Sequence, residues 1–135
     1  MAAVDDVDEL IEQFHLALGE FMKGNPEPEK MLWSRGDDAT LTNPQGSTAR
    51  GWDEVAEVME RAASTRRDGR FLGFETLAKY ATADLAYVVE LERLEAKVHG
   101  GEEISPYALR VTMIFRPEEG VWKVVHRHAD QVTTA

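Results

Sequence analysis

Apolar side chains in the first half of the chain recur at the spacing of helices. We expect a first helix whose apolar face carries Val7, Leu10, Ile11, Phe14, Leu18 and Phe21. The breaker Gly24-Asn25-Pro26 ends it, and a short second helix through Glu29 and Trp33 ends near Gly36. Residues 39–42 are predicted as a short strand and residues 43–46 as a turn. A third helix is expected after Gly51, with one apolar face formed by Trp52, Val55, Val58, Met59 and Ala62.

The second half of the chain changes to a period of two, which is typical of strands. Strands are expected over residues 71–80, 85–98, 107–116 and 122–130, with hairpin turns at residues 100–101 and 117–120. Helices followed by an antiparallel meander predict one α+β domain over residues 1–135. In this domain a curved, mostly antiparallel sheet wraps around three N-terminal helices as a cone, and it can enclose a small ligand. Apolar residues on the outer sheet face favour a homodimer through the sheet.

The last expected strand carries two of the four histidines of the chain. Strict alternation places on one face Trp122, Val124, His126, His128 and Asp130. The opposite face then carries Lys123, Val125, Arg127 and Ala129. A titratable stripe with apolar neighbours indicates that this strand lines a pocket or an interface.

Two registers of the last hairpin remain open. If Arg110 and Thr112 pair with His128 and His126, four polar groups share one surface, and Arg110 can bind a ligand carboxylate there. If the register slips by one residue, Arg110 faces Arg127 instead, and the two arginines form a basic pocket. The four-residue turn and the match of apolar positions favour the second register.

Composition narrows the functional classes. The chain has 135 residues, no cysteine and a formal net charge of −10. Disulfides, thiol catalysis and thiolate metal sites are therefore excluded, and the negative charge argues against nucleic acid and anionic membranes as partners. Neither a secretory signal nor an apolar run of membrane-spanning length is evident, so we expect a cytoplasmic protein.

Two segments are similar to a known family. Leu109-Arg110-Val111-Thr112, together with residues 122–130, resembles the C-terminal hairpin of SnoaL-like proteins in the nuclear transport factor two-like superfamily. The kinase association domain of calcium/calmodulin-dependent kinase is similar there too. Residues 38–47 resemble the strand of ketosteroid isomerases that carries an Asp-Pro-x-Gly turn. The resemblance covers the whole chain in element order and implies the cone fold and the sheet dimer, but this fold hosts enzymes, binders and assembly domains alike.

The residues that the isomerase comparison implies for catalysis are absent. Asn43 occupies the position of the carboxylate base, and Phe14 aligns with the tyrosine that donates to the oxyanion. An amide is not a base at neutral pH, and a phenyl ring donates no hydrogen bond. Isomerase chemistry by the usual residues is therefore not expected, and the plainer role of Asn43 is to cap its turn.

His126 and His128 are two apart on one strand, a spacing that zinc and iron sites use. No third ligand follows at close spacing, so we expect structural histidines, no metal site and no cofactor. A role in acid–base chemistry comes second, because histidine titrates near neutrality. Asp130 is interpreted as a solvated or turn-forming carboxylate, with a role beside His128 as the alternative.

The candidate ligand pocket comprises Phe14, Trp33, Asn43, Met59, Arg110 and Arg127. Glu90 and Glu92 are the expected counter-charges of the arginines, and the basic run at residues 66–70 is interpreted as a solvated helix end. We favour a binding protein for an apolar or carboxylate-bearing small molecule. The alternatives are an acid–base isomerase, cyclase or hydratase using His126, His128 or Asp130, and a non-catalytic assembly domain.

Overall fold

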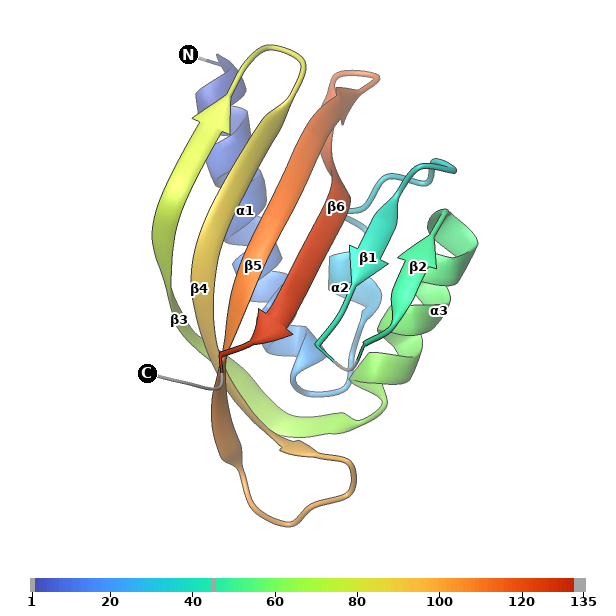
Figure 1. Cartoon of the computed structure of the whole chain (residues 1–135), viewed down its shortest axis with the longest axis vertical. Helices are drawn as coiled ribbons and strands as arrows, with labels where there is room; N and C mark the ends of the chain where they lie inside the picture. Colours follow the sequence, from blue (N-terminus) through green and yellow to red (C-terminus); the bar gives the residue numbers. More distant parts are fainter. Residues whose placement is uncertain (1, 45, 133–135) are drawn as a thin grey trace.

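Three helices and one six-stranded sheet make up the computed structural model, which describes residues 2–44 and 46–132. The helices are α1 (Ala2–Phe21), α2 (Glu27–Lys30) and α3 (Trp52–Ala63). The strands are β1 (Thr40–Thr42), β2 (Thr48–Arg50), β3 (Arg66–Ala81), β4 (Ala86–Val98), β5 (Ser105–Glu118) and β6 (Val121–Gln131). Their order in the sheet is β2-β1-β6-β5-β4-β3, and only β1 and β6 are parallel. The predicted α+β class with a mostly antiparallel curved sheet is therefore confirmed (Figure 1).

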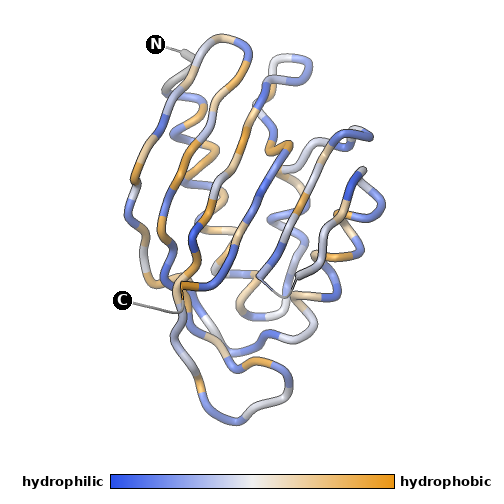
Figure 2. Tube along the Cα trace, in the orientation of Figure 1, coloured by the Kyte–Doolittle hydropathy of each residue, from blue (hydrophilic) through white to orange (hydrophobic). Residues whose placement is uncertain are grey.

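The helices cover one face of the sheet, which we call the inner face, and leave the outer face open (Figure 1). The apolar positions of α1 point to the sheet as the helical spacing predicts, with Val7, Leu10 and Phe14 all buried. On β5 the inner stripe is Leu109, Val111, Met113 and Phe115. Apolar and polar segments alternate along the strands accordingly (Figure 2). This packing forms the core between sheet and helices.

A β-bulge in β6 breaks the strict alternation expected for that strand. Phe115 pairs with Val124 but Ile114 pairs with His126, so Val125 is an extra residue without a partner on β5. Val124 faces the core before the bulge, and Arg127 and Ala129 face the core after it. The bulge thus turns the histidines to the outer face although they share parity with Val124.

The favoured register of the β5–β6 hairpin is wrong. Arg110 pairs with Asp130 and Thr112 with His128, so these polar groups share the outer face. The first alternative also placed these polar groups on one surface, but it paired Arg110 with His128. The observed partner on β6 lies two residues further along the strand. Arg110 does not face Arg127 for two reasons. The turn consists of Glu119 and Gly120 alone instead of the expected residues 117–120, which shifts the pairing by two residues, and the bulge shifts it by one more.

Several element boundaries also differ from those expected. The second helix ends at Lys30, β2 is an additional short strand, and β3 begins at Arg66 instead of residue 71. The basic run at residues 66–70 is therefore the start of a strand, not a helix end. It contains a register shift at Asp68 and Gly69, and Asp68 has a φ of 56°.

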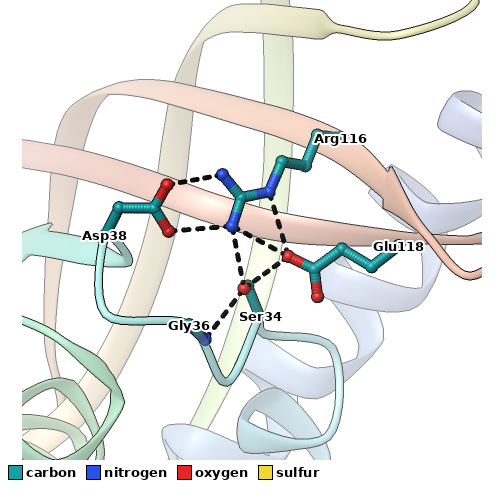
Figure 3. Close-up of polar contacts among 5 residues, drawn as sticks. All are labelled: Ser34, Gly36, Asp38, Arg116 and Glu118. Carbon is teal, nitrogen blue, oxygen red and sulfur yellow. Dashed lines mark hydrogen bonds and ion pairs between the residues drawn. The ribbon is translucent and has the colours of Figure 1, made fainter.

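A side-chain clamp fixes the loop between α2 and β1 against the sheet (Figure 3). Arg116 on β5 donates two hydrogen bonds to Asp38, of 2.6 and 2.8 Å, and one of 3.0 Å from Nε to Glu118. Ser34 donates to the same Glu118 carboxylate at 2.6 Å and accepts a bond from the Gly36 amide. Arg116 holds the pKa of Asp38 below its usual value by this pairing. The clamp positions β1 beside β6.

Within the described residues, no helix is both long and apolar enough to cross a membrane.

Candidate functional site

A largely apolar cavity lies between the inner sheet face and the helices. Its volume is about 70 Å³. The apolar part of its lining comes from α1, α3 and the strands, and includes Leu18, Met22, Leu41, Val58, Met59 and Leu94. The polar part is small and consists of Glu29, Thr42, Asn43, Arg66, Tyr107 and Arg127. An apolar space with a few polar groups is typical of a small-molecule site.

Arg127 forms a buried ion pair at the wall of this cavity. Its guanidinium donates two hydrogen bonds to Glu92, of 2.7 and 2.9 Å, and lies 5.1 Å from the ring centroid of Phe14. The paired guanidinium lowers the pKa of Glu92 despite the opposing effect of burial, which is the largest single contribution. Since Glu92 occupies both terminal nitrogens of Arg127, this arginine is already neutralised. The expectation that Glu90 and Glu92 are the counter-charges of the arginines is thus confirmed for Glu92 and wrong for Glu90, which pairs with His15, while Arg110 pairs with Asp130.

Glu29 on α2 is a buried carboxyl group that itself lines the cavity. Only 3% of the residue is exposed. Burial raises its pKa to about 7, while the charge of Arg127 acts in the opposite direction and that of Glu92 adds to the rise. The sequence does not reveal this residue, because a glutamate in a short helix ordinarily faces solvent.

Glu90 on β4 is another buried carboxyl group, and it is not part of the cavity lining. Its carboxylate lies 2.8 Å from Nε2 of His15, whose ring stacks on Phe71 at a centroid distance of 4.7 Å. Burial raises the pKa of Glu90 to about 7, and the neighbouring Glu92 adds to this effect. Two adjacent inner-face glutamates on one strand thus have opposite pKa shifts, since only Glu92 has an arginine.

His15, Glu90 and Glu92 each place one metal-ligating atom within 4.8 Å of the others. Carboxylates and imidazole are ligands of several divalent cations. However, the two oxygens of Glu92 accept from Arg127, and a cation would have to displace that ion pair. The arrangement therefore fits a buried charge network better than a metal centre.

Arg66 lies at the mouth of the cavity, in the basic run that sequence analysis interpreted as solvated. Its exposed fraction is 9%. It donates from Nε to the Tyr107 hydroxyl at 3.3 Å and from Nη1 to Thr65 at 2.7 Å, and Tyr107 donates to the sulfur of Met22. An adjoining depression of about 250 Å³ shares with the cavity the residues Pro44, Arg66, Tyr107 and Leu109. The two spaces therefore adjoin at these four residues.

The catalytic candidates His126, His128 and Asp130 lie on the opposite side of the sheet from the cavity. His126 contacts Thr40 through Nδ1 at 2.8 Å, and Arg110 forms a bidentate ion pair with Asp130. Burial lowers the pKa of His126, and Arg110 lowers that of Asp130. With His128 these residues border a shallow outer-face depression. No residue of this group reaches the inner cavity.

The predicted pocket residues divide between the two faces. Asn43, Met59 and Arg127 line the cavity, whereas Phe14 and Trp33 are buried in the core beside it and are not part of its lining. Arg110 lies on the outer face. Asn43 also accepts a hydrogen bond from the amide of Ser47, in keeping with its role as a turn cap. The contribution of each residue to ligand binding stays a prediction.

Comparison with solved structures defines the class of fold. A nuclear transport factor 2-like superfamily protein from Salmonella enterica serovar Typhimurium superimposes with a TM-score of 0.79 at 15% identity, covering 97% of this chain and 92% of that one. An NTF2-like family protein from Streptomyces avermitilis gives 0.80 at 21% identity, with 97% and 96% covered. A ketosteroid isomerase-like protein from Erwinia carotovora atroseptica gives 0.78 at 19% identity, with 96% of both chains covered. The chain therefore has the NTF2-like fold.

The family model of the SnoaL-like domain matches residues 7–133, and the chain belongs to this family. No curated protein matches the chain significantly.

Proposed function

We propose that this protein is a single SnoaL-like domain over residues 1–135 that binds a small, largely apolar molecule in its inner cavity. The observation that carries the proposal is the combination of an apolar lining with two buried ionisable groups, Glu29 and Arg127, at its wall. The lining excludes water from the body of a ligand, and the ionisable groups orient one polar function.

The size of the cavity limits the ligand. Pockets for drug-sized molecules measure roughly 300–1,000 Å³, whereas this cavity has about 70 Å³. A ligand therefore has few heavy atoms, or it extends through the mouth into the adjoining depression of about 250 Å³. Compact alcohols, ketones and short-chain acids fit this description.

Acid–base catalysis is the second candidate function, and Glu29 is the observation that favours it. A carboxyl group with a pKa of about 7 both donates and accepts a proton near neutral pH. Its position on the cavity wall places it within reach of a ligand hydroxyl or carbonyl. In this proposal Glu29 takes the part that the sequence assigned to His126, His128 or Asp130.

Binding is tested by filling the cavity. Ala62→Leu places a larger side chain into the lining, whereas Ala56→Leu makes the same change on the same helix at a residue outside it. We expect compact alcohols, ketones and acids to shift amide NMR signals around the cavity in the wild type and in Ala56→Leu. The shifts are expected to weaken at least about tenfold in Ala62→Leu, since a buried ligand competes with the added methyl groups for the same space. Equal binding to both variants would contradict the inner cavity as the site.

A further inference from the structure

Three arginines occur in the basic run at the start of β3, and they differ in their burial and in their ion pairs. Arg70 pairs with Glu95 at 2.8 Å, and Arg67 lies 3.9 Å from Asp68 and 3.8 Å from Glu102. Both side chains are largely exposed. Arg66 is the buried member of the three, and none of the ion pairs among the described residues includes it. A buried cation without an anion is unusual, because burial of a charge is costly unless it is paired.

The guanidinium of Arg66 retains unused donors. Of its five N–H groups, one is used in the bond from Nε to Tyr107 and one in the bond from Nη1 to Thr65. Nη2 has no acceptor among the described residues. The sealed polar side-chain atoms without a partner in the described part of the chain are Trp33 Nε1 and Glu90 Oε1, so Nη2 is open to solvent space. Arg66 lines both the cavity and the adjoining depression.

The position of Arg66 is set by the fold. It pairs with Val98 of β4 near the end of the sheet, where the long β4–β5 hairpin and the turn after β1 lie close to the start of β3 (Figure 1). Its side chain rests against Tyr107, with the guanidinium carbon 5.8 Å from the ring centroid. Tyr107 and Thr65 thereby hold Nε and Nη1 of the guanidinium, and Nη2 is the nitrogen left for a further acceptor.

We propose that Arg66 is the anchor for the carboxylate of an amphipathic monocarboxylic acid whose apolar body occupies the inner cavity. This inference rests on the proposed binding function and specifies the ligand class of the same site. A carboxylate accepts two N–H groups of one guanidinium edge, which supplies the missing counter-charge. One monovalent anion balances one arginine, and the net charge of −10 disfavours more highly charged anions. Glu29 and Arg66 both belong to the lining, and the charges that act on Glu29 are those of Arg127 and Glu92.

The test compares acids with neutral molecules of the same shape. Butanoate, hexanoate and octanoate are titrated against butanamide, hexanamide and octanamide, and the dissociation constants are measured by NMR and calorimetry on the wild-type chain. We expect the acids to bind about tenfold or more tightly than the amides, because a hydrogen bond to a charged group contributes at least such a factor. This comparison needs no mutation.

Two variants then locate the anchor. Arg66→Met should reduce binding of the acids to the level of the amides, whereas Arg70→Met on the same strand should leave the preference intact. Arg66→Lys keeps the charge but not the bidentate geometry, and we expect it to retain part of the preference. Equal affinity for acids and amides, or an acid preference that survives Arg66→Met, would overturn the anchor while leaving the binding proposal in place. Absence of binding by every acid and amide would overturn both.

Discussion

Glu29 shows how one buried residue couples the candidate site to the stability of the fold. The short helix α2 begins at Glu27 after Pro26 and leads into the buried Trp33, so its inner side faces the sheet. The carboxyl group of Glu29 therefore lies in a largely apolar lining, and the nearby guanidinium of Arg127 is already paired with Glu92. Burial consequently dominates, and the protonated form of Glu29 is favoured in the folded chain.

This predicts that stability falls as pH rises toward neutrality. The pKa of Glu29 is about 7 in the folded chain against an ordinary value of 4.5. Between these values the folded state binds more protons than the unfolded state, so the free energy of unfolding decreases with pH. The contribution is complete below pH 4.5 and lost above about pH 7, and at about 1.4 kcal/mol per pKa unit it amounts to about 3 kcal/mol at most.

Glu29→Gln should flatten that dependence, measured by urea unfolding at several pH values across the window. Glu90, whose pKa is also raised to about 7, maintains the remainder of the slope. Glu12→Gln, at an exposed position of α1, serves as the control and should keep the wild-type slope. A slope in Glu29→Gln identical to that of the control would contradict the raised pKa.

Backbone irregularities in two strands determine which side chains reach the site. The extra residue Val125 in β6 turns Arg127 inward and the histidines outward. At the start of β3, the shift between Arg67 and Arg70 brings the backbone at Gly69 very close to β4. A Cβ atom at Gly69 would lie 2.3 Å from the carbonyl oxygen of Glu95. Both irregularities lie beside the cavity walls, where bulges commonly redirect side chains.

Gly69→Ala is therefore expected to destabilise the protein by roughly 1–3 kcal/mol, the usual cost of overpacking, because the atoms it meets belong to the backbone and to Ala96. Gly73→Ala provides the matched control on the same strand. There the added Cβ atom meets only the flexible end of Arg93, at 3.1 Å, which can move aside. Urea unfolding of the two variants should separate them clearly, and equal stabilities would argue against a close contact at Gly69.

At the scale of the whole molecule the described residues offer two candidate sites of interaction, the inner cavity and the uncovered outer sheet face. Apolar side chains on the outer face include Tyr80 and Tyr87, whose rings lie 6.2 Å apart and whose exposed fractions are 60% and 41%. Exposed aromatic residues on a face that also carries the Arg110–Asp130 ion pair suit a protein contact. We propose that two copies associate through this face.

The proposed homodimer predicts a mass near twice that of the chain in sedimentation equilibrium. Tyr87→Lys places a charge within the contact and should shift the protein to monomer. Leu16→Lys also replaces an exposed apolar residue, 71% accessible, but it lies on α1 at the other side of the molecule. We expect this control to remain dimeric. A wild-type chain that is monomeric at every concentration would exclude the outer face as a dimer contact.

Local pattern predicted the fold and part of the site. The helical spacing of Phe14 and its neighbours and the alternation along β5 are fixed by chemistry within a few residues, so helices, strands and the core stripe could be identified. Three expected pocket residues line the cavity for different reasons. Met59 was identified by helical spacing, Asn43 by the isomerase resemblance, and Arg127 through a hairpin register that the structure does not have. Glu29 and Arg66 were not, because their burial depends on segments distant in sequence.

The sequence by itself determined the α+β class, the order of elements and the SnoaL-like family, because periodicity and turn residues act locally. Only the tertiary structure decided which side of β6 faces the cavity, that Glu92 rather than Glu90 pairs with Arg127, and that Arg66 lies buried beside the cavity. A single extra residue in a strand exchanges its two faces, and partners in a buried ion pair are chosen by the register between strands. Neither the position of a bulge nor the register between two strands can be read from the spacing of residues along one segment.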